Sequence, residues 1–324
     1  MNKKKFLIIV STFLLVIVGL VLAVVFIPRD DDVDVNEFSE EYLKYKEIFD
    51  FELSDDKKYF IITDLRSEHR NDKEISIPNT IDNVPVKKWL DTNEKNFSGF
   101  KDVSIINIPE NIEYIGTDSL DKGFLNGGTL GDSFLTASGS KTFSINVDPA
   151  NKVYSSEDGI LFNKDKTILI RYPNSKSDEE TFFDYHIPEG VREIYGKAFY
   201  YNLTLRQVTF NNELEGIFDN AFQGCTKLKQ LNFATESSLT YISNGAFKNT
   251  GLMNVNLPKG VTTISGTAFS YCTELTRLYI PETVKSFGRN ILTGSPKAIV
   301  YTTEGNVNFL KSQDSFKNVQ VKFE

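Results

Sequence analysis

The sequence is poor in the residue types that build metal sites and most catalytic sites. Its 324 residues include only two cysteines, Cys225 and Cys272, and two histidines, His69 and His186. Two cysteines cannot form the disulfide framework of a small secreted domain. Neither histidine lies near a cysteine in the chain or has a recognisable catalytic motif around it. We therefore expect no catalytic residues, no metal site and no enzyme activity.

Two segments could be mistaken for cofactor sites. The glycine- and serine-containing stretch at residues 126–140 lacks the G-x-x-x-x-G-K-[ST] spacing of a phosphate-binding loop and the helix that follows it. The acidic run at residues 178–180 lacks the spacing of an EF-hand, so a solvated loop is the better interpretation. We expect no cofactor and no small-molecule substrate.

Positive charge is scarce beyond the first five residues. The chain has 36 Lys and Arg against 44 Asp and Glu, and three of the lysines are Lys3, Lys4 and Lys5. Residues 6–324 therefore carry 33 basic and 44 acidic side chains, a net charge of −11. Binding to nucleic acid needs a clustered basic face that neutralises phosphates. No nucleic-acid partner is expected.

What the sequence does contain is an internal repeat of about 23 residues. Four complete copies have apolar residues at seven equivalent positions, the last two being an Ala-Phe pair or, in the fourth copy, Ile-Leu. The positions are Leu205, Val208, Phe210, Leu214, Ile217, Ala221, Phe222; Leu228, Leu231, Phe233, Leu239, Ile242, Ala246, Phe247; Leu252, Val255, Leu257, Val261, Ile264, Ala268, Phe269; and Leu275, Leu278, Ile280, Val284, Phe287, Ile291, Leu292.

This period and its L-x-x-L-x-L core predict a β-rich leucine-rich repeat solenoid with short helical or 3-10 turns. One strand per coil would stack into a parallel sheet along a concave face, and each Ala-Phe pair would close its coil inside the core. Cys225 and Cys272 are two coils apart, so their Cα atoms should be nearly 10 Å apart. A disulfide needs less than about 7 Å. We predict two unpaired, mostly buried thiols that act as small apolar wedges.

Several phrases resemble the BspA-like leucine-rich repeat family of bacterial cell-surface proteins. They are IPEGVREIYGKAF at residues 187–199, AFQGCTKLKQLNF at 221–233 and LPKGVTTISGTAFSYCTELTRLYIPETV at 257–284, together with the insert SSEDGILFNKDKTILIRYP at 155–173. The resemblance covers roughly residues 50–300. It implies an extracellular, non-enzymatic solenoid used for adhesion or partner binding.

The N-terminus is apolar and free of charge from Phe6 to Ile27. As a helix, these 22 residues would span about 33 Å, enough for the hydrocarbon core of a membrane. The apolar core of a cleaved signal peptide is usually only about 7 to 15 residues long. We predict an uncleaved signal-anchor whose N-terminal lysines stay in the cytoplasm while the repeats lie outside the cell.

The predicted domain order follows from these segments. Residues 1–28 form the cytoplasmic tip and transmembrane anchor, and residues 29–46 an acidic spacer. The spacing of Phe38, Tyr42, Tyr45 and Phe49 also allows a short amphipathic helix near the spacer's end. Residues 47–300 form the solenoid with an N-terminal cap hairpin, and residues 301–324 a C-terminal cap.

Two parts of the solenoid are less regular. In the first coil Trp89 is predicted to fill the place of the closing Phe. Residues 150–182 interrupt the repeat, and their strands at 160–162 and 168–172 are expected to form a hairpin that stands off the stack. Inserts of this kind often modify a binding surface.

The candidate partner-binding residues are the positions of each predicted strand that point out from the concave face. They can form hydrogen bonds to a partner, but stacked Gln and Asn side chains can equally bond to each other and stabilise the sheet. The residues are Asp184, His186, Gln207, Thr209, Gln230, Asn232, Asn254, Asn256, Arg277 and Tyr279.

The sequence thus predicts a single-pass membrane protein that binds an extracellular protein or glycan partner in adhesion or another surface interaction. A structural scaffold in a cell-envelope complex is one alternative. A secreted soluble binding protein is the other, if the N-terminal segment is cleaved.

Overall fold

The structure is a computed structural model of the whole chain. It describes residues 39–324 except 70–71, 91–102, 117–142 and 175–181. The predicted membrane segment, the 126–140 stretch and the acidic run at 178–180 lie outside the described residues, as does the first part of the predicted spacer. Within the described ranges, no helix combines the length and the apolar character needed to cross a membrane.

The described chain begins with a helix that packs on a hairpin. The helix α1 (Glu40–Ile48) starts after Ser39, whose Oγ accepts the N–H of Tyr42 at 2.9 Å. The strands β1 (Phe49–Leu53) and β2 (Phe60–Leu65) are antiparallel, as predicted for the N-terminal cap. Tyr42 is buried edge-to-face against Phe51, with ring centroids 5.1 Å apart. The helical alternative is therefore correct for these residues.

The next strands form two small sheets. β5 lies between β2 and β7 and also pairs with β4, while β3, β6 and β8 form a parallel sheet of their own. A short 3-10 helix precedes them. The bounds are η2 (Ser67–His69), β3 (Glu74–Ser76), β4 (Thr80–Ile81), β5 (Val84–Leu90), β6 (Ile105–Ile108), β7 (Tyr114–Gly116) and β8 (Ser144–Val147).

The prediction for Trp89 was wrong. Trp89 lies within β5, opposite Ile115 of β7, and its ring packs edge-to-face on Phe49 at 5.9 Å. It occupies a strand position of a regular coil and not the position of the closing Phe. The seven-residue strand β5 pairs on both sides, so the chain has no turn at this point.

The insert is part of the stack and does not stand off from it, which corrects the prediction. β10 (Ile160–Asn163) pairs antiparallel with β9 (Tyr154–Glu157) and β11 (Ile168–Arg171), and β11 continues parallel onto the first strand of the regular coils. All four residues of β11 are buried. A run that is apolar on both faces must be covered on both faces, which explains its place in the core.

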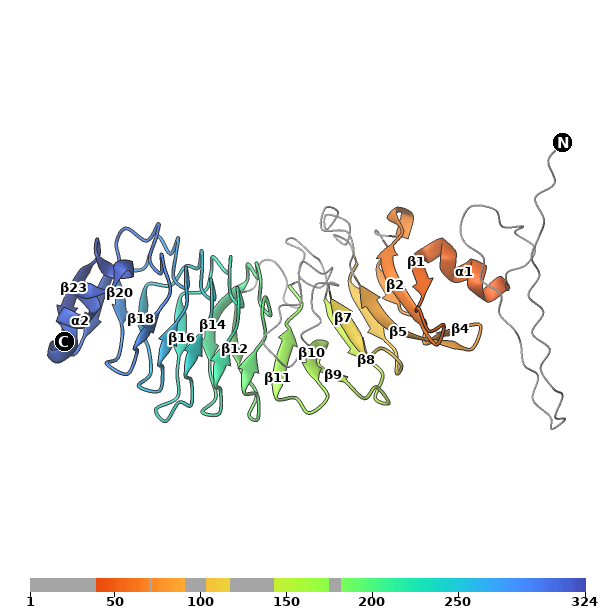
Figure 1. The fold of residues 1–324 in the computed structure, drawn as a ribbon, viewed down its shortest axis with the longest axis horizontal. Helices are drawn as coiled ribbons and strands as arrows, with labels where there is room; N and C mark the ends of the chain where they lie inside the picture. Colours follow the sequence, from red (N-terminus) through yellow and green to blue (C-terminus); the bar gives the residue numbers. More distant parts are fainter. Residues whose placement is uncertain (1–38, 70–71, 91–102, 117–142, 175–181) are drawn as a thin grey trace. The chain divides into compact units, whose positions relative to one another are not determined.

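Each regular coil contributes one longer and one shorter strand, and the coils follow one another along the stack (Figure 1). The longer strands carry the L-x-x-L-x-L residues, and the two-residue strands carry the residue equivalent to Ile217. The longer strands are β12 (Phe183–His186), β14 (Leu205–Thr209), β16 (Gln230–Asn232), β18 (Asn254–Asn256), β20 (Arg277–Tyr279) and β22 (Ile299–Thr302). The shorter strands are β13 (Glu193–Ile194), β15 (Gly216–Ile217), β17 (Tyr241–Ile242), β19 (Thr263–Ile264) and β21 (Ser286–Phe287).

The shorter and the longer strands differ in how continuously they pair along the stack. The short strands form one unbroken sheet with β11, β10 and β9. The longer strands form two sheets, β12-β14-β16 and β18-β20-β22-β23, where a single sheet was predicted. The coils that carry β16 and β18 are therefore not paired at their longer strands, although their short strands and the turns around their Ala-Phe pairs remain bonded.

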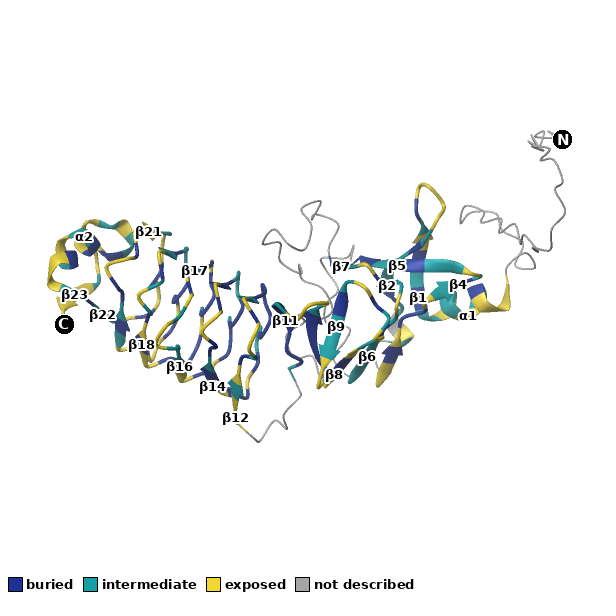
Figure 2. Ribbon diagram, turned by 90° about the horizontal axis from the view of Figure 1, so that it is seen from below, coloured by how far each residue is buried: buried dark blue, intermediate teal, exposed yellow. Residues whose placement is uncertain are grey.

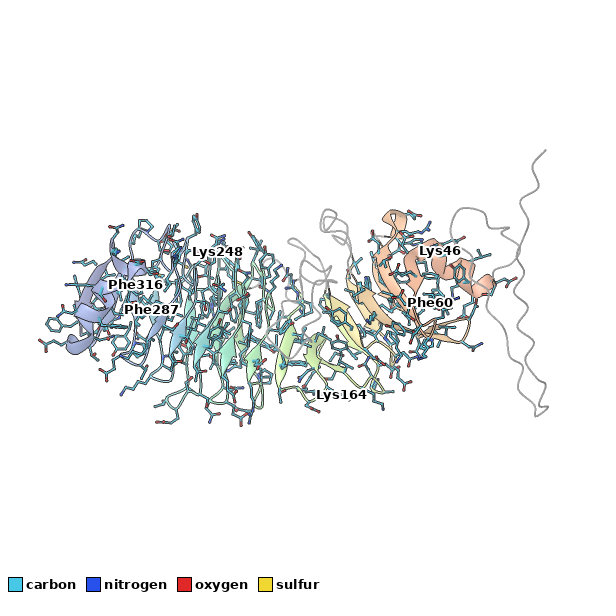
Figure 3. The ribbon with its side chains drawn as sticks, in the orientation of Figure 1. Lys46, Phe60, Lys164, Lys248, Phe287 and Phe316 are labelled. Carbon is cyan, nitrogen blue, oxygen red and sulfur yellow. The ribbon has the colours of Figure 1, made fainter. Side chains whose placement is uncertain are left out.

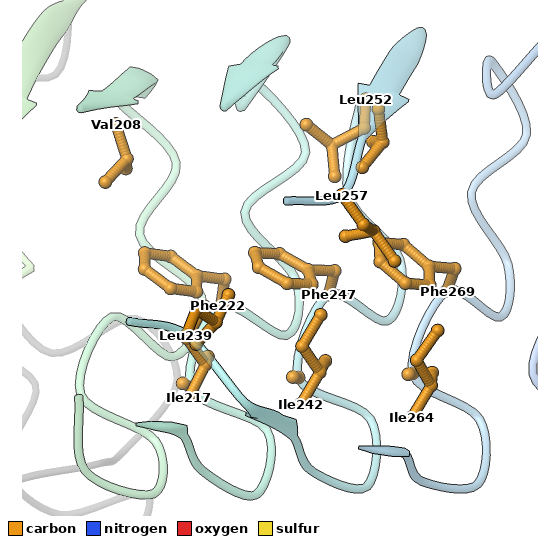
Figure 4. Close-up of a cluster of buried hydrophobic side chains, with 14 of the residues drawn as sticks. Val208, Ile217, Phe222, Leu239, Ile242, Phe247, Leu252, Leu257, Ile264 and Phe269 are labelled. Carbon is orange, nitrogen blue, oxygen red and sulfur yellow. The ribbon is translucent and has the colours of Figure 1, made fainter. Parts of the chain in front are cut away.

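The core between the sheets is a column of stacked rings, one per coil (Figure 4). Neighbouring rings of Phe199, Phe222, Phe247 and Phe269 are nearly parallel, with centroids 4.8, 5.3 and 5.3 Å apart. Residues of positive φ stand directly before each Ala-Phe pair and two places after its ring, where the chain turns into and out of the core, and the Ile291-Leu292 pair is flanked in the same way. They are Lys197, Tyr201, Asn220, Gly224, Gly245, Asn249, Thr267, Tyr271, Asn290 and Gly294.

The framework predicted from the sequence is buried almost completely (Figure 2). Only Leu231, Phe233 and Phe287 are half-buried, and all three pack on the core. The repeat framework is therefore confirmed.

The C-terminal residues cover the last coil. Phe316 packs edge-to-face on Phe287, with ring centroids 5.2 Å apart (Figure 3). The last strand then pairs parallel with β22, as the alternation of Val319, Val321 and Phe323 indicated. The elements are η5 (Glu304–Asn306), α2 (Val307–Ser312), η6 (Asp314–Phe316) and β23 (Gln320–Phe323).

Candidate binding face

The ten candidate residues are aligned in two rows across the longer strands. Asp184, Gln207 and Gln230 are partners in register, as are His186, Thr209 and Asn232; Asn254 aligns with Arg277, and Asn256 with Tyr279. All ten are exposed or half-buried. We call the surface that they mark the ladder face.

Hydrogen bonds along the stack hold the first part of the ladder face. Arg206 donates from Nε and a terminal nitrogen to the carboxylate of Asp184, at 2.9 and 2.7 Å. This bidentate bond lowers the pKa of Asp184. Gln230 donates to Asn232 at 2.6 Å, and Asn232 donates to Thr209 at 3.2 Å. The bond from Asn232 crosses to the neighbouring coil, whereas the bond from Gln230 stays within its own strand.

The second part of the ladder face is organised around Arg277. Its guanidinium lies 4.3 Å from the ring centroid of Tyr301 and forms an ion pair with Glu324. Arg277 is therefore not a free anchor. Tyr301, which aligns with Tyr279 in register, was not among the predicted residues, although its strand was. Its alternation with Ile299 could have indicated it.

A pocket of about 870 Å³ opens beside this second part. One wall is the segment at residues 233–237 after β16, and the other is the segment at 256–260, which begins with the last residue of β18. Tyr279, Arg277 and Glu324 complete the lining. Of the pocket's lining, only Asn256, Arg277 and Tyr279 were among the ten candidate residues. The signal was present, because five residues lie between Phe233 and Leu239, where the other copies have three.

Arg171 is the largest buried charged side chain of the described residues, and the two histidines lie outside the buried core. Arg171 is buried and donates to the backbone oxygen of Lys197 at 2.6 Å, and burial lowers its pKa to about 9. His69 contacts Asp72 at 2.8 Å, and His186 lies on the ladder face. No group of three potential metal-ligating side chains gathers anywhere in the described ranges.

The two cysteines are free and fully buried, as predicted. They also do more than fill space. The thiol of Cys225 donates to the backbone oxygen of Phe199 at 3.0 Å, and that of Cys272 to the backbone oxygen of Phe247 at 3.1 Å. Burial raises the pKa of Cys225 to about 12.

The regular coils match a known family of repeats. The model of the BspA type leucine rich repeat region matches residues 192–322, in six copies. The repeat region belongs to the BspA-type leucine-rich repeat family. This confirms the resemblance drawn from its phrases.

Solved structures with a similar fold include three bacterial proteins. A leucine rich cell surface protein from Faecalibacterium prausnitzii is 19% identical, with a TM-score of 0.51 over 76% of this chain and 62% of that one. The pneumococcal vaccine antigen PcpA is 23% identical, with a TM-score of 0.44 over 78% and 57%. A leucine-rich repeat protein from Bacteroides ovatus is 17% identical, with a TM-score of 0.36 over 86% and 98%.

The likeness to the Faecalibacterium prausnitzii protein indicates a shared fold only. The chain spans less than two thirds of the length of the first two structures. No curated protein matches the sequence. The BspA-type repeat is therefore established for residues 192–322.

Proposed function

We propose that this protein is a non-catalytic binding protein displayed on the outer side of a bacterial membrane. Residues 6–27 would anchor it, with the N-terminus in the cytoplasm and the repeats outside. The ladder face would bind an extracellular protein, or alternatively a glycan, in adhesion or another surface interaction. Membership of a repeat family found in bacterial surface proteins supports this proposal.

The observation that carries the proposal is the order of the ladder face. Exposed polar side chains usually lose conformational freedom when a partner binds, and this loss weakens binding. Here bonds along the stack already hold Asp184, Asn232 and Arg277 in place. A partner would therefore meet a preformed polar surface on a rigid support, and little conformational freedom would be lost on binding.

The test compares two pairs of substitutions in the full-length protein displayed on cells. His186→Ala with Gln207→Ala removes two side chains of the ladder face. Thr262→Ala with Ser286→Ala removes two exposed side chains near the short-strand sheet and serves as the control. Binding of the cells to a panel of immobilised matrix proteins is measured, together with the melting temperature of each variant.

We expect the wild-type protein to confer binding, the ladder-face pair to reduce it and the control pair to leave it unchanged. Equal binding by cells that lack the protein would contradict the adhesion proposal. The scaffold alternative predicts instead that native pull-downs recover envelope proteins of the same cell. Mass spectrometry of the mature N-terminus decides between an anchored and a secreted form.

A further inference from the structure

The break between β16 and β18 is confined to one side of the stack. No ladder joins Gln230–Asn232 to Asn254–Asn256. On the other side, the same two coils remain paired, with Tyr241 opposite Thr263 and Ile242 opposite Ile264. The two coils therefore separate like a wedge that opens on the ladder face.

The spacing of the second copy explains the wedge. Three residues lie between Phe210 and Leu214, but five lie between Phe233 and Leu239. At regular junctions, the N–H after the longer strand donates to the next coil, as Phe210 does to Asn232 at 2.8 Å. Within the described part of the chain, the N–H of Phe233 makes no such bond. The two extra residues redirect the chain before this bond can form.

The wedge exposes part of the core. Leu231 and Phe233 are half-buried, whereas their equivalents Val208 and Phe210 are buried. The pocket of about 870 Å³ lies at this point. Its size falls within the range of ligand sites. It therefore offers an apolar floor with a polar rim.

The distance between β16 and β18 argues against a peptide ligand that is inserted between them as an extra strand. A peptide strand inserted between β16 and β18 would need these strands to be about 9.6 Å apart, twice the normal spacing. Cα atoms of β16 and β18 lie within 8 Å of each other. The pocket thus suits a compact ligand at the ends of the strands better than an added strand between them.

The charges of the rim argue against a second class of ligand, strongly charged molecules. Arg277 is paired with Glu324, and the remaining charged side chains are Glu236 on one wall and Lys259 on the other. The four formal charges sum to zero. A phosphate-rich or strongly charged ligand would need a surplus of one sign. The rim therefore favours a neutral ligand.

The remaining groups match a sugar. Tyr279 supplies a half-buried ring, and the C–H face of a pyranose packs against such rings. The exposed amide of Asn256 has no side-chain hydrogen bond within the described residues, so its donors and acceptor are available to hydroxyl groups. Glu236 and Lys259 can bond to further hydroxyls from opposite walls.

We propose that this pocket binds a neutral oligosaccharide, with one sugar ring on Tyr279 and its hydroxyls bonded to Asn256, Glu236 and Lys259. This inference rests on the proposed binding function and names the ligand class at one end of the ladder face. The residues that it uses differ from those that test protein binding, His186 and Gln207.

The experiment applies the full-length protein, purified in detergent, to an array of neutral oligosaccharides of glucose, galactose, mannose and N-acetylglucosamine. Affinity for the strongest binder is then measured by calorimetry. Loss of one or two neutral hydrogen bonds corresponds to a change of about tenfold in affinity. We expect Asn256→Ala and Tyr279→Ala to weaken binding by about tenfold or more, and Tyr279→Phe to weaken it less.

Asn254→Ala is the matched control, because Asn254 is an exposed asparagine on the same strand that does not line the pocket. It should leave the affinity unchanged. Asn256 is also exposed, so the loss of its amide should not unfold the protein. Melting temperatures of all variants check this.

Two outcomes would overturn the inference. One is a wild-type protein that binds no oligosaccharide of the array. The other is an equal loss of affinity in Asn254→Ala and Asn256→Ala. Loss of oligosaccharide binding with intact binding to matrix proteins supports the inference. If the array stays empty while His186→Ala with Gln207→Ala still loses matrix binding, the saccharide inference fails and the proposed function stands.

Discussion

The column of stacked rings predicts that Phe247 is among the most sensitive positions of the chain. Its ring is fully buried and is stacked on both sides, 5.3 Å from Phe222 and 5.3 Å from Phe269. Replacing a buried Phe by Ala typically lowers the free energy of unfolding by about 3 to 5 kcal/mol. Loss of two stacked neighbours places Phe247→Ala toward the upper end of that range.

Urea unfolding measures this effect with two probes. Far-UV circular dichroism follows the strands of all coils. Fluorescence follows Trp89, the only tryptophan, which lies in β5 near the N-terminal cap. Because each repeat of a solenoid contacts only its neighbours, we expect the midpoint from circular dichroism to fall more than that from Trp89.

Phe323→Ala is the control for this prediction. Phe323 is 66% exposed, so its loss should change the free energy of unfolding by no more than about 0.5 kcal/mol. If Phe247→Ala shifts neither midpoint further than this control, the rings do not carry the stability of the coils. The packing argument would then be refuted.

Three further predictions concern single residues. Gly288→Ala should destabilise by about 1 to 3 kcal/mol, because its Cβ would lie 2.0 Å from the backbone of the preceding coil, whereas Gly305→Ala has nothing within 4 Å; thermal melts should separate the two variants. The Cys225 thiol, whose pKa burial raises to about 12, should resist a thiol reagent at pH 8 until urea unfolds the chain. Burial, with a neighbouring carboxylate, raises the pKa of Glu193, so the ionised form is disfavoured in the folded state. Glu193→Gln should therefore raise the melting temperature at pH 7, and the gain should vanish as the pH falls below about 4. Glu189→Gln, an exposed control, should show neither effect, and a gain independent of pH would contradict the assignment.

The regular coils could be predicted from the sequence because their period is strict. Seven apolar positions recur in each copy, and every strand register follows once one coil is aligned. Asp184 pairs with Gln207 and Asn256 with Tyr279, as the period requires. The pairing of a repeated residue can therefore be predicted from its position within one copy.

The errors occur where the period fails. The 160–172 hairpin was placed outside the stack because an apolar run alone does not show which neighbour covers it, and β13 proved to be that neighbour. Trp89 was assigned by size and not by strand pairing. The ion pair of Arg277 was not predicted because its partner, Glu324, comes 47 residues later and lies beyond the repeats.

The break in the longer-strand sheet is an intermediate case. The two additional residues between Phe233 and Leu239 were visible in the sequence, but their effect was not. An insertion can bulge outward without disturbing either sheet, or it can separate two strands. Only the arrangement of both coils shows that one sheet opens while the other stays closed.

The positive-φ residues on both sides of each ring mean that every coil enters and leaves the core in the same way. A gene that gains or loses one whole copy therefore still encodes matching neighbours at the new junction. Each added copy would lengthen the polar surface by about 4.8 Å, the spacing of adjacent strands. Related proteins can thus differ in the length of this surface by whole repeats, while the contacts between neighbouring coils stay the same.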